Sequence, residues 1–283
     1  MSRTLEIIRS LRTTPPLPSV ALRLMDLVRE PGYSVDAVVD LVSMDPSLTA
    51  RVLRLTNSAM FALPAAVTTV PQAVTFVGSR NLVKLALVSC AANQFRDVPN
   101  SIYGTTTELW RHTYAVAATC QLLAGHCGFA DTSTAFTAGI LHNVGKVALT
   151  QTIGDEPLPE IGDEGSHVER EASVFGIDHA AAAGVIADAW ALPRDLAAAL
   201  RAHHDEDAVR DGSLLVALVA AADDIVLAAG IGNAFPDLDV RVSPATCERL
   251  QLTTDDIECL TADAIDELGR NAELLNLEGI TDR

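Results

Sequence analysis

Signals that begin a helix recur along this chain, each placed before a segment rich in apolar residues. Within these segments apolar residues recur three and four positions apart, as on one face of a helix, and we find no convincing alternating run typical of a strand. Ser166 and Glu169 have the spacing of a capping box. The other candidate N-caps are Asp45 (followed by Pro46), Ser79, Thr132, Asp178 and Ser213. We therefore predict an all-α fold.

The charge is distributed unevenly along the 283 residues. The formal net charge is −17, yet residues 1–100 contain 10 basic and 7 acidic side chains, against 10 and 30 in the rest. No acidic residue lies between Asp45 and Asp97. Composition and charge both change near residue 100. We predict a helical subdomain at 1–100, a second at 101–242 and acidic helices at 243–283.

The overall acidity and the hydropathy pattern exclude several classes of partner. A negative protein repels the phosphates of nucleic acids and anionic membranes, so we do not expect a nucleic-acid partner. No stretch of about 18 uncharged apolar residues could span a bilayer, and the first residues lack the apolar block of a signal peptide. We expect a cytoplasmic protein without a membrane partner. The sequence leaves the oligomeric state open.

Histidines gather in the helical segments of the central part of the chain, and an aspartate lies inside the apolar segment 214–229. A buried carboxylate is costly unless a cation, a donor or water meets it. Helical bundles build metal sites from imidazoles and carboxylates that project inward from several helices, and mixed N/O sites suit iron, manganese or zinc. The candidate ligands are His112, His142, His179, His203, His204 and Asp223. The alternative at each histidine is a partly buried, hydrogen-bonded ring.

The order of these residues resembles the ligand order of the HD superfamily of metal-dependent phosphohydrolases. In that superfamily a histidine, a His-Asp doublet and a distant aspartate hold one metal, and further histidines can hold a second. Several stretches resemble its HDOD (HD-related output domain) branch, from about residue 10 to 230: TPPLPS (14–19), DPSLTARVLRLTNSAMF (45–61), TTVPQAVTFVGSRNLVKLAL (68–87), FTAGILHNVGK (136–146) and FGIDHAAAAGVIADAWALP (175–193). The resemblance implies an N-terminal helical bundle packed on an HD-like helical bundle. It also implies a regulatory role, since such domains often lack hydrolase activity.

The doublet departs from the superfamily pattern, because it is His142-Asn143 here. An aspartate would supply negative charge and can bridge two ions, whereas asparagine offers only a neutral carbonyl oxygen. Lost charge beside a metal also weakens the activation of its bound water. We expect Asn143 to be a candidate metal ligand as well, but a weaker one, so that a two-metal hydrolase is impaired. A single divalent ion held by His112, His142 and Asp223 is still compatible with the sequence.

Lys146 is the one candidate catalytic residue, because some phosphodiesterases of the HD superfamily place a functional lysine there. The alternative is a lysine that complements the dipole at a helix C-terminus. A candidate partner surface lies in the acid-free window, where a signalling protein acting in trans or a small anionic ligand could meet cationic side chains. Its residues are Arg51, Arg54, Arg80 and Lys84. A solvated helix face is the alternative.

Two functional hypotheses follow. The first is a non-catalytic regulatory module for signal transduction, which binds a partner protein or small ligand and retains a metal site. The second is a metal-dependent phosphohydrolase that acts on a nucleotide or cyclic nucleotide. The first is favoured by Asn143, and the second by the retained histidines and Asp223.

Overall fold

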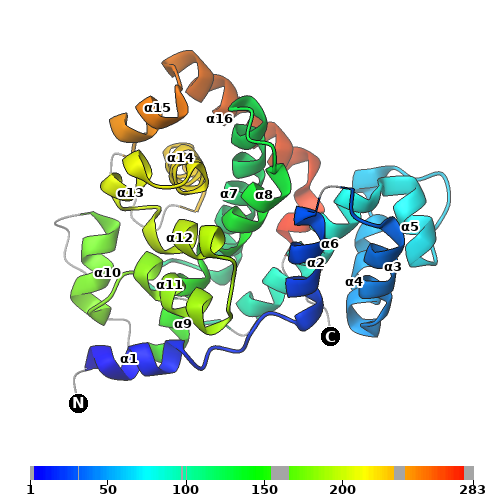
Figure 1. The fold of residues 1–283 in the computed structure, drawn as a ribbon, viewed down its shortest axis with the longest axis horizontal. Coiled ribbons are helices and arrows are strands. Elements are labelled where there is room, and N and C mark those ends of the chain that lie inside the picture. Colours follow the sequence, from blue (N-terminus) through cyan, green and yellow to red (C-terminus); the bar gives the residue numbers. More distant parts are fainter. Residues whose placement is uncertain are drawn as a thin grey trace. The chain divides into compact units, whose positions relative to one another are not determined.

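The structure is a computed structural model that describes residues 3–30, 32–96, 98–99, 101–153, 166–232 and 240–276. Within these ranges every regular element is a helix, and the only β-type pairing is an isolated bridge between Ser101 and Gly104. The all-α prediction is confirmed (Figure 1). The chain forms two compact units, which are described separately.

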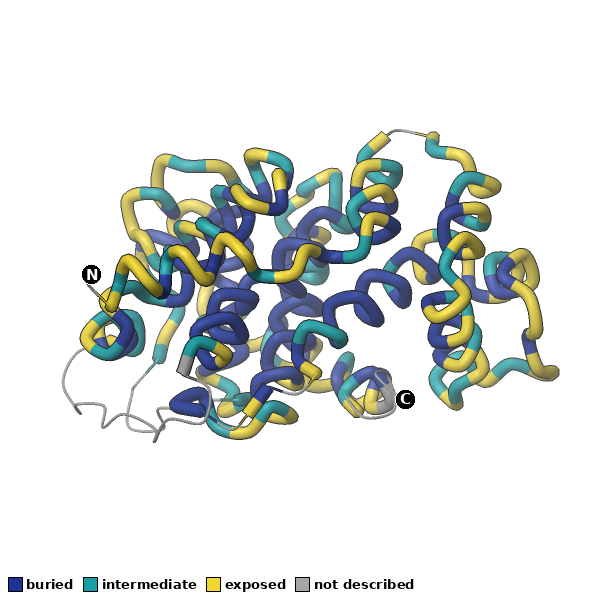
Figure 2. Tube along the Cα trace, turned by 90° about the horizontal axis from the view of Figure 1, so that it is seen from below, coloured by how far each residue is buried: buried dark blue, intermediate teal, exposed yellow. Residues whose placement is uncertain are grey.

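The first unit comprises Met1–Pro15 and Asp97–Ile265. Helix α7 packs against α8 and α14, while α11 packs against α9 and α12. Most residues of α7 and α14 are buried, so these two helices form the centre of the unit's core (Figure 2). Its helices are α1 (Arg3–Leu11), α7 (Thr106–His126), α8 (Thr132–Leu141), α9 (Val144–Ile153), α10 (His167–Phe175), α11 (His179–Ala189), α12 (Arg194–Ala202), α13 (Glu206–Asp211), α14 (Leu214–Ala228), α15 (Pro244–Leu250) and most of α16 (Thr254–Arg270).

The second unit comprises Pro16–Arg96 and Asp266–Arg283. Its central helix is α6, which is buried along most of its length and packs against α2, α4 and α5. Residues 277–283, at the end of the predicted acidic segment, lie outside the described residues. The helices of this unit are α2 (Ser19–Arg29), α3 (Val35–Ser43), α4 (Pro46–Thr56), η1 (Ala59–Phe61), α5 (Val70–Val77), α6 (Ser79–Ala92), η2 (Asn93–Phe95), the end of α16 and η3 (Ala272–Leu275).

The capping signals place most of these helix starts correctly. The Asp45 and Asp178 carboxylates accept backbone N–H groups at the starts of α4 and α11, and the capping box of Ser166 and Glu169 is present at α10. Ser213 occupies the N-cap position of α14 but makes no side-chain cap bond. These local hydrogen bonds fix where α10 and α11 begin, and each of the two helices begins with a histidine.

Two predicted caps are wrong by one residue. Thr132 is the first residue of α8, and Asp131 before it supplies the cap by accepting the Thr134 N–H. Ser79 is likewise the first residue of α6, and Gly78 takes the N-cap position with a φ of 82°. A positive φ favours glycine over residues with a Cβ, so Gly78 turns the chain between α5 and α6.

Two glycines allow helices of the first unit to approach closely. A Cβ built on Gly139 of α8 would lie 2.5 Å from the Ala117 Cα of α7. A Cβ on Gly145 of α9 would overlap the carbonyl oxygen of His179 at the start of α11. Both contacts are with backbone atoms, which cannot rotate away. These glycines therefore set the spacing of α8 on α7 and of α9 on α11.

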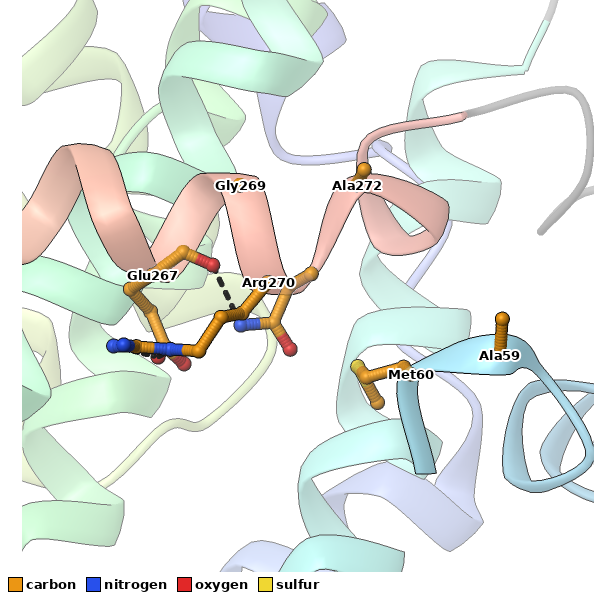
Figure 3. A pocket seen from close by; sticks show the side chains of 7 residues that line it. Ala59, Met60, Glu267, Gly269, Arg270 and Ala272 are labelled. Atoms are coloured by element: carbon orange, nitrogen blue, oxygen red, sulfur yellow. Dashed lines mark hydrogen bonds and ion pairs between the residues drawn. The ribbon is translucent and has the colours of Figure 1, made fainter. Parts of the chain in front are cut away.

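A pocket of about 490 Å³ lies in the second unit, between η1 and the end of α16 (Figure 3). Ala59 and Met60 line one side, and residues between Glu267 and Ala272 line the other. The Arg270 guanidinium donates to the Glu267 carboxylate at 3.0 Å, so the two charged groups of the lining are paired with each other. The pocket holds no histidine or cysteine and is not a candidate metal site.

Among the described helices, no single one is long and apolar enough to cross a membrane. One bent pair, Val70–Val77 with Ser79–Phe95, meets the length and composition criteria when the two segments are taken together.

Candidate metal centre

Six of the seven histidines gather around Asp223 in the first unit. His112 lies in α7, His142 and His203 are the C-cap residues of α8 and α12, and Asp223 lies inside α14. The structure brings together all the histidines and the aspartate that the sequence singled out. It adds one that the sequence analysis missed: His167, the first residue of α10. Their assignment as metal ligands remains a prediction.

The first group consists of His112, His142 and Asp223, all fully buried. The Asp223 Oδ1 atom lies 2.9 Å from His112 Nε2 and 3.7 Å from His142 Nε2. None of these three atoms has a hydrogen-bond partner, because the short contacts do not have hydrogen-bond geometry. Unpartnered buried polar atoms are rare and costly. Three that face one another are typical of a site that holds a cation.

The tautomers of these rings are set by main-chain carbonyl groups. The Nδ1 atom of His112 lies 3.0 Å from the Ile231 oxygen, and that of His142 lies 2.6 Å from the Gly139 oxygen. A carbonyl oxygen only accepts, so each Nδ1 must carry the proton. In a neutral imidazole the Nε2 atom is then a bare lone pair. This outer hydrogen bonding is the usual way in which proteins orient metal-binding histidines.

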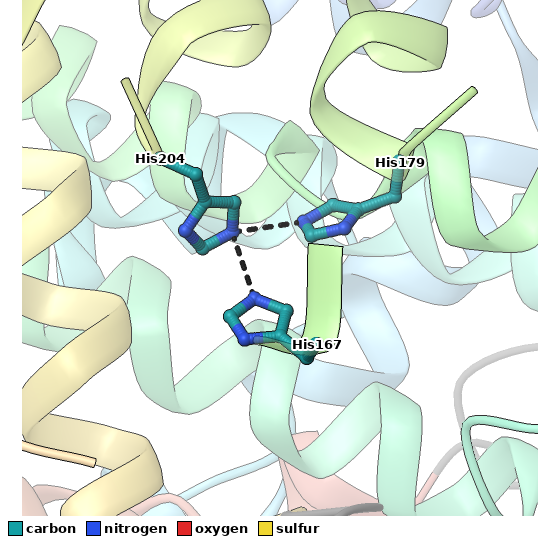
Figure 4. A group of neighbouring side chains, drawn as sticks. All are labelled: His167, His179 and His204. Carbon is teal, nitrogen blue, oxygen red and sulfur yellow. Dashed lines mark hydrogen bonds between the residues drawn. The ribbon is translucent and has the colours of Figure 1, made fainter. Parts of the chain in front are cut away.

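The second group consists of His167, His179 and His204 (Figure 4). The Nε2 atom of His204 lies 3.2 Å from the Nε2 atoms of both His167 and His179. The Nδ1 atom of His179 lies 2.7 Å from the Glu171 carboxylate, which also accepts the His179 backbone N–H at 2.7 Å. His203 lies between the two groups, with its Nε2 atom 3.3 Å from that of His179.

Burial favours the uncharged form of five of the clustered imidazoles. It lowers the pKa of His167 to about 4 and that of His203 to about 3, and it lowers the pKa of His142, His179 and His204 as well. Burial alone would raise the pKa of Asp223. His112 and His142 can lower that pKa only by donating from a protonated Nε2, and with Nδ1–H fixed by main-chain oxygens such a proton is present only in the charged ring. The five rings with a lowered pKa present neutral nitrogens at neutral pH, which is the form that binds metal.

We expect the metal-free protein to lose stability as the pH falls from 6.5 towards 4. The unfolded chain takes up protons near the ordinary histidine pKa of about 6.5, whereas the folded cluster takes them up only at lower pH. The histidine contribution to stability is therefore complete above pH 6.5 and is lost as the pH falls towards the folded pKa values. Glu171 and Asp224 act in the opposite direction, since burial raises their pKa to about 7 and about 8, but five histidines outnumber them.

Urea denaturation in the presence of a chelator, at pH values from 7.5 to 4, measures this loss. His167→Gln should flatten the acid slope by up to about one proton. His126→Gln is the matched control, because the His126 ring lies outside the cluster and is 41% exposed. A midpoint that does not change between pH 6.5 and 4.5 would contradict the expectation.

Asn143 and Lys146 flank the junction between α8 and α9. Asn143 is fully buried, its Nδ2 atom donates to Thr113 Oγ1 at 3.4 Å, and its Oδ1 atom has no partner. Lys146 is the third residue of α9, so the alternative that it complements the dipole at a helix C-terminus does not hold. Its Nζ atom lies 5.6 Å from the centre of the Tyr103 ring. Its charge contributes to the lowered pKa of His179, so the cation acts on the cluster.

The candidate partner surface of the second unit is smaller than the sequence suggests. Arg51 is buried (8% exposed) and donates to Ser47 Oγ at 2.6 Å. Lys84 is half-buried, and its Nζ atom lies 3.6 Å from the Glu267 carboxylate. Arg54 and Arg80 are exposed. A partner surface built on these two arginines stays a prediction.

The sequence gives little indication that His167 and Glu171 belong to the site. They lie four residues apart on α10, and Glu171 is fully buried although most of its helix is not. The position directly after an N-cap predicts that a histidine is exposed on the surface. Glu171 one turn later would not have identified it, because the donor to that carboxylate is His179 and its burial depends on tertiary packing.

Comparison with known proteins agrees with this fold. The HDOD domain family matches residues 14–206. A solved HDOD domain protein of unknown function from Geobacter sulfurreducens has a TM-score of 0.74 and 23% identity, covering 96% of this chain and 97% of that one. A structure from Shewanella amazonensis SB2B, provisionally named as a phosphohydrolase, has a TM-score of 0.68 and 25% identity, covering 98% of each chain.

A curated relative is also similar to part of this sequence. An uncharacterized protein of Treponema pallidum (strain Nichols) is 29% identical over 197 residues, which is 68% of this chain; the aligned part spans only 37% of that relative's length. The family match extends from before α2 to the start of α13, and it includes His112, His142 and His179. The chain belongs to the HDOD domain family.

Proposed function

We propose that this chain is a regulatory signal-transduction module that holds one divalent transition metal at His112, His142 and Asp223. The observation that carries the proposal is the set of facing, unpartnered acceptor atoms at these residues, 2.9 and 3.7 Å apart. A cation would satisfy all of them at once and offset the buried charge of Asp223. Two imidazole nitrogens and a carboxylate oxygen suit iron, manganese or zinc.

Regulation is favoured over hydrolysis by Asn143. A buried neutral amide stands where a carboxylate would add charge to the metal and help to activate a bound water. The charge of Lys146, which contributes to the lowered pKa of His179, and that of the metal would both attract a small anion. We infer that the module responds to a small anionic ligand at this site or transmits metal occupancy to a signalling protein supplied in trans.

The alternative function is a metal-dependent phosphohydrolase for a nucleotide or cyclic nucleotide. It is favoured by the four histidines grouped with Asp223, which are His112, His142, His203 and His204. It is also favoured by Lys146, whose charge could stabilise that of a phosphoryl group. Both hypotheses include the metal site, and they differ in whether the protein hydrolyses a substrate there.

Metal analysis of protein purified without a metal-binding tag tests the proposal. We expect His142→Ala and Asp223→Ala each to hold about one equivalent of iron, manganese or zinc fewer than the wild type. His126→Ala, which removes a histidine outside the cluster, should hold as much as the wild type. Circular dichroism checks that each variant is folded. Equal metal content in wild type and folded Asp223→Ala would refute the site.

A hydrolysis assay then separates the two functions. The wild type, loaded with manganese, iron or zinc, is incubated with nucleotides and cyclic nucleotides. No turnover above that of His142→Ala is the result expected of a regulatory module. Sustained turnover that disappears in folded His142→Ala would overturn it in favour of the phosphohydrolase.

A further inference from the structure

Phe76 lies on α5 in the second unit with half of its side chain in contact with solvent (50% exposed). Among the five exposed large apolar side chains of the described residues, it is the only aromatic one. Gln72 and Thr75, which share its side of α5, are exposed as well. Aromatic rings are enriched where proteins bind one another. This ring is therefore a candidate anchor for a partner.

The pocket of the second unit has the size and the lining to accept such a ring (Figure 3). Its volume is about 490 Å³, and a cavity of about 150 Å³ is enough to hold benzene. Ala59 and Met60 line the side formed by η1, and Gly269 and Ala272 belong to the opposite side. A Cβ built on Gly269 would meet no atom within 4 Å, so this wall leaves room for an incoming side chain.

The polar groups of the pocket lining are already satisfied by one another. The Arg270 guanidinium donates to the Glu267 carboxylate at 3.0 Å, and Asn271 Nδ2 donates to the Glu267 main-chain oxygen at 2.7 Å. A small polar ligand would have to break these bonds to make its own. An apolar side chain needs none of them, and its burial against Met60 and the small residues is favourable.

The charges around the ring and around the pocket are complementary. Residues 46–96, which include α5, contain five basic and no acidic side chains. Helix α16, whose end forms one side of the pocket, contains six acidic residues and one basic residue. Exposed Arg80 follows Phe76 by four positions, and exposed Asp266 directly precedes the pocket residue Glu267. Complementary charges steer two surfaces together and fix their orientation.

We propose that the Phe76 ring of one copy of this chain enters the pocket of a second copy, so that the protein associates with itself through its second unit. The ring does not fill the pocket of its own chain, because it is half exposed. Ring and pocket are different parts of the surface, so the contact is heterologous, and each chain can offer a ring to one neighbour and a pocket to another. The contact does not involve the proposed metal site.

Sedimentation velocity of the full chain over a range of concentrations, with a chelator present, measures the association. The weight-average sedimentation coefficient of the wild type should rise with concentration. Phe76→Ser lacks the ring and Gly269→Gln fills the pocket, so each should remain monomeric. Leu5→Ser is the matched control, because Leu5 is an equally exposed apolar residue (58%) on α1 in the first unit. It should associate like the wild type. Circular dichroism establishes that each variant is folded.

An equimolar mixture of Phe76→Ser and Gly269→Gln tests whether the ring and the pocket meet each other. The first variant keeps an open pocket and the second keeps the ring, so the mixture should form dimers although neither protein does so alone. No larger species should form, because such a dimer has no second ring and open pocket left. A mixture that stays monomeric would overturn the proposal, and so would a Phe76→Ser protein that associates like the wild type. A wild type that is monomeric throughout would also overturn it and leave Phe76 to a different partner.

Discussion

Gly145→Ala should destabilise the protein by about 3 kcal/mol or more, an effect at the upper end for a single methyl group. The added Cβ would overlap the His179 carbonyl oxygen and lie 2.9 Å from the Ala183 nitrogen. These are backbone atoms of α11, so the clash cannot be relieved by rotating a side chain. Helix α9 must move away from α11, which opens the buried interface and displaces His179 from its partners. Urea denaturation measures the loss.

Gly125→Ala is the matched control. Gly125 lies in the last turn of α7, and a Cβ there would meet nothing within 4 Å. Alanine is the better helix former by about 1 kcal/mol, so this variant should be as stable as the wild type or more so. If both variants unfold at the wild-type urea concentration, α9 and α11 do not pack as closely as described.

Asn143→Asp should have two large effects of opposite sign. Without metal, it adds a carboxylate to a fully buried position beside Thr113, where burial penalises the charge. We expect a loss of about 3 kcal/mol in unfolding free energy at neutral pH. With metal, the new carboxylate is a stronger ligand than the amide oxygen, and affinity should rise at least about tenfold.

Thermal melting with chelator and with saturating manganese measures both effects on the same protein. Asn143→Leu is the control, because it removes the amide without adding charge and should not gain metal affinity. An Asn143→Asp protein with wild-type metal affinity would place residue 143 out of reach of the ion. A metal-free variant as stable as the wild type would mean that the added carboxyl group is protonated or hydrated.

The fold was predictable because its signals are local. A capping carboxylate or hydroxyl acts within three residues, and helical periodicity is visible in a single segment. The two wrong caps, Ser79 and Thr132, lie one position after the true N-caps, where neighbouring residues compete for the same role. The residues that make up each unit could not be predicted from the sequence, because each unit combines segments that lie far apart in the chain. Such segments are brought together by tertiary contacts, which a change in composition near residue 100 does not indicate.

The candidate site was partly predictable for a related reason. His142, His203 and Asp223 stand out because polar residues in apolar helices need a partner. His167 and Glu171 do not, since a helix start tolerates both in solvent. Arg51 shows the converse: the sequence suggests a surface cation, but it is buried and donates to Ser47 one turn earlier. Whether a charged side chain is exposed depends on what covers its helix, and that is a tertiary property.

The anchors of the histidine rings bear on how this site can change in evolution. His112, His142 and His203 hold their Nδ1 protons against main-chain oxygens, and no point mutation can delete a main-chain oxygen. The orientation of these rings therefore tolerates side-chain substitutions for as long as the positions of the helices are unchanged. His179 is different, because its anchor is the side chain of Glu171. A single codon change at Glu171 removes this anchor, so the orientation of His179 depends on a side chain that mutation can replace.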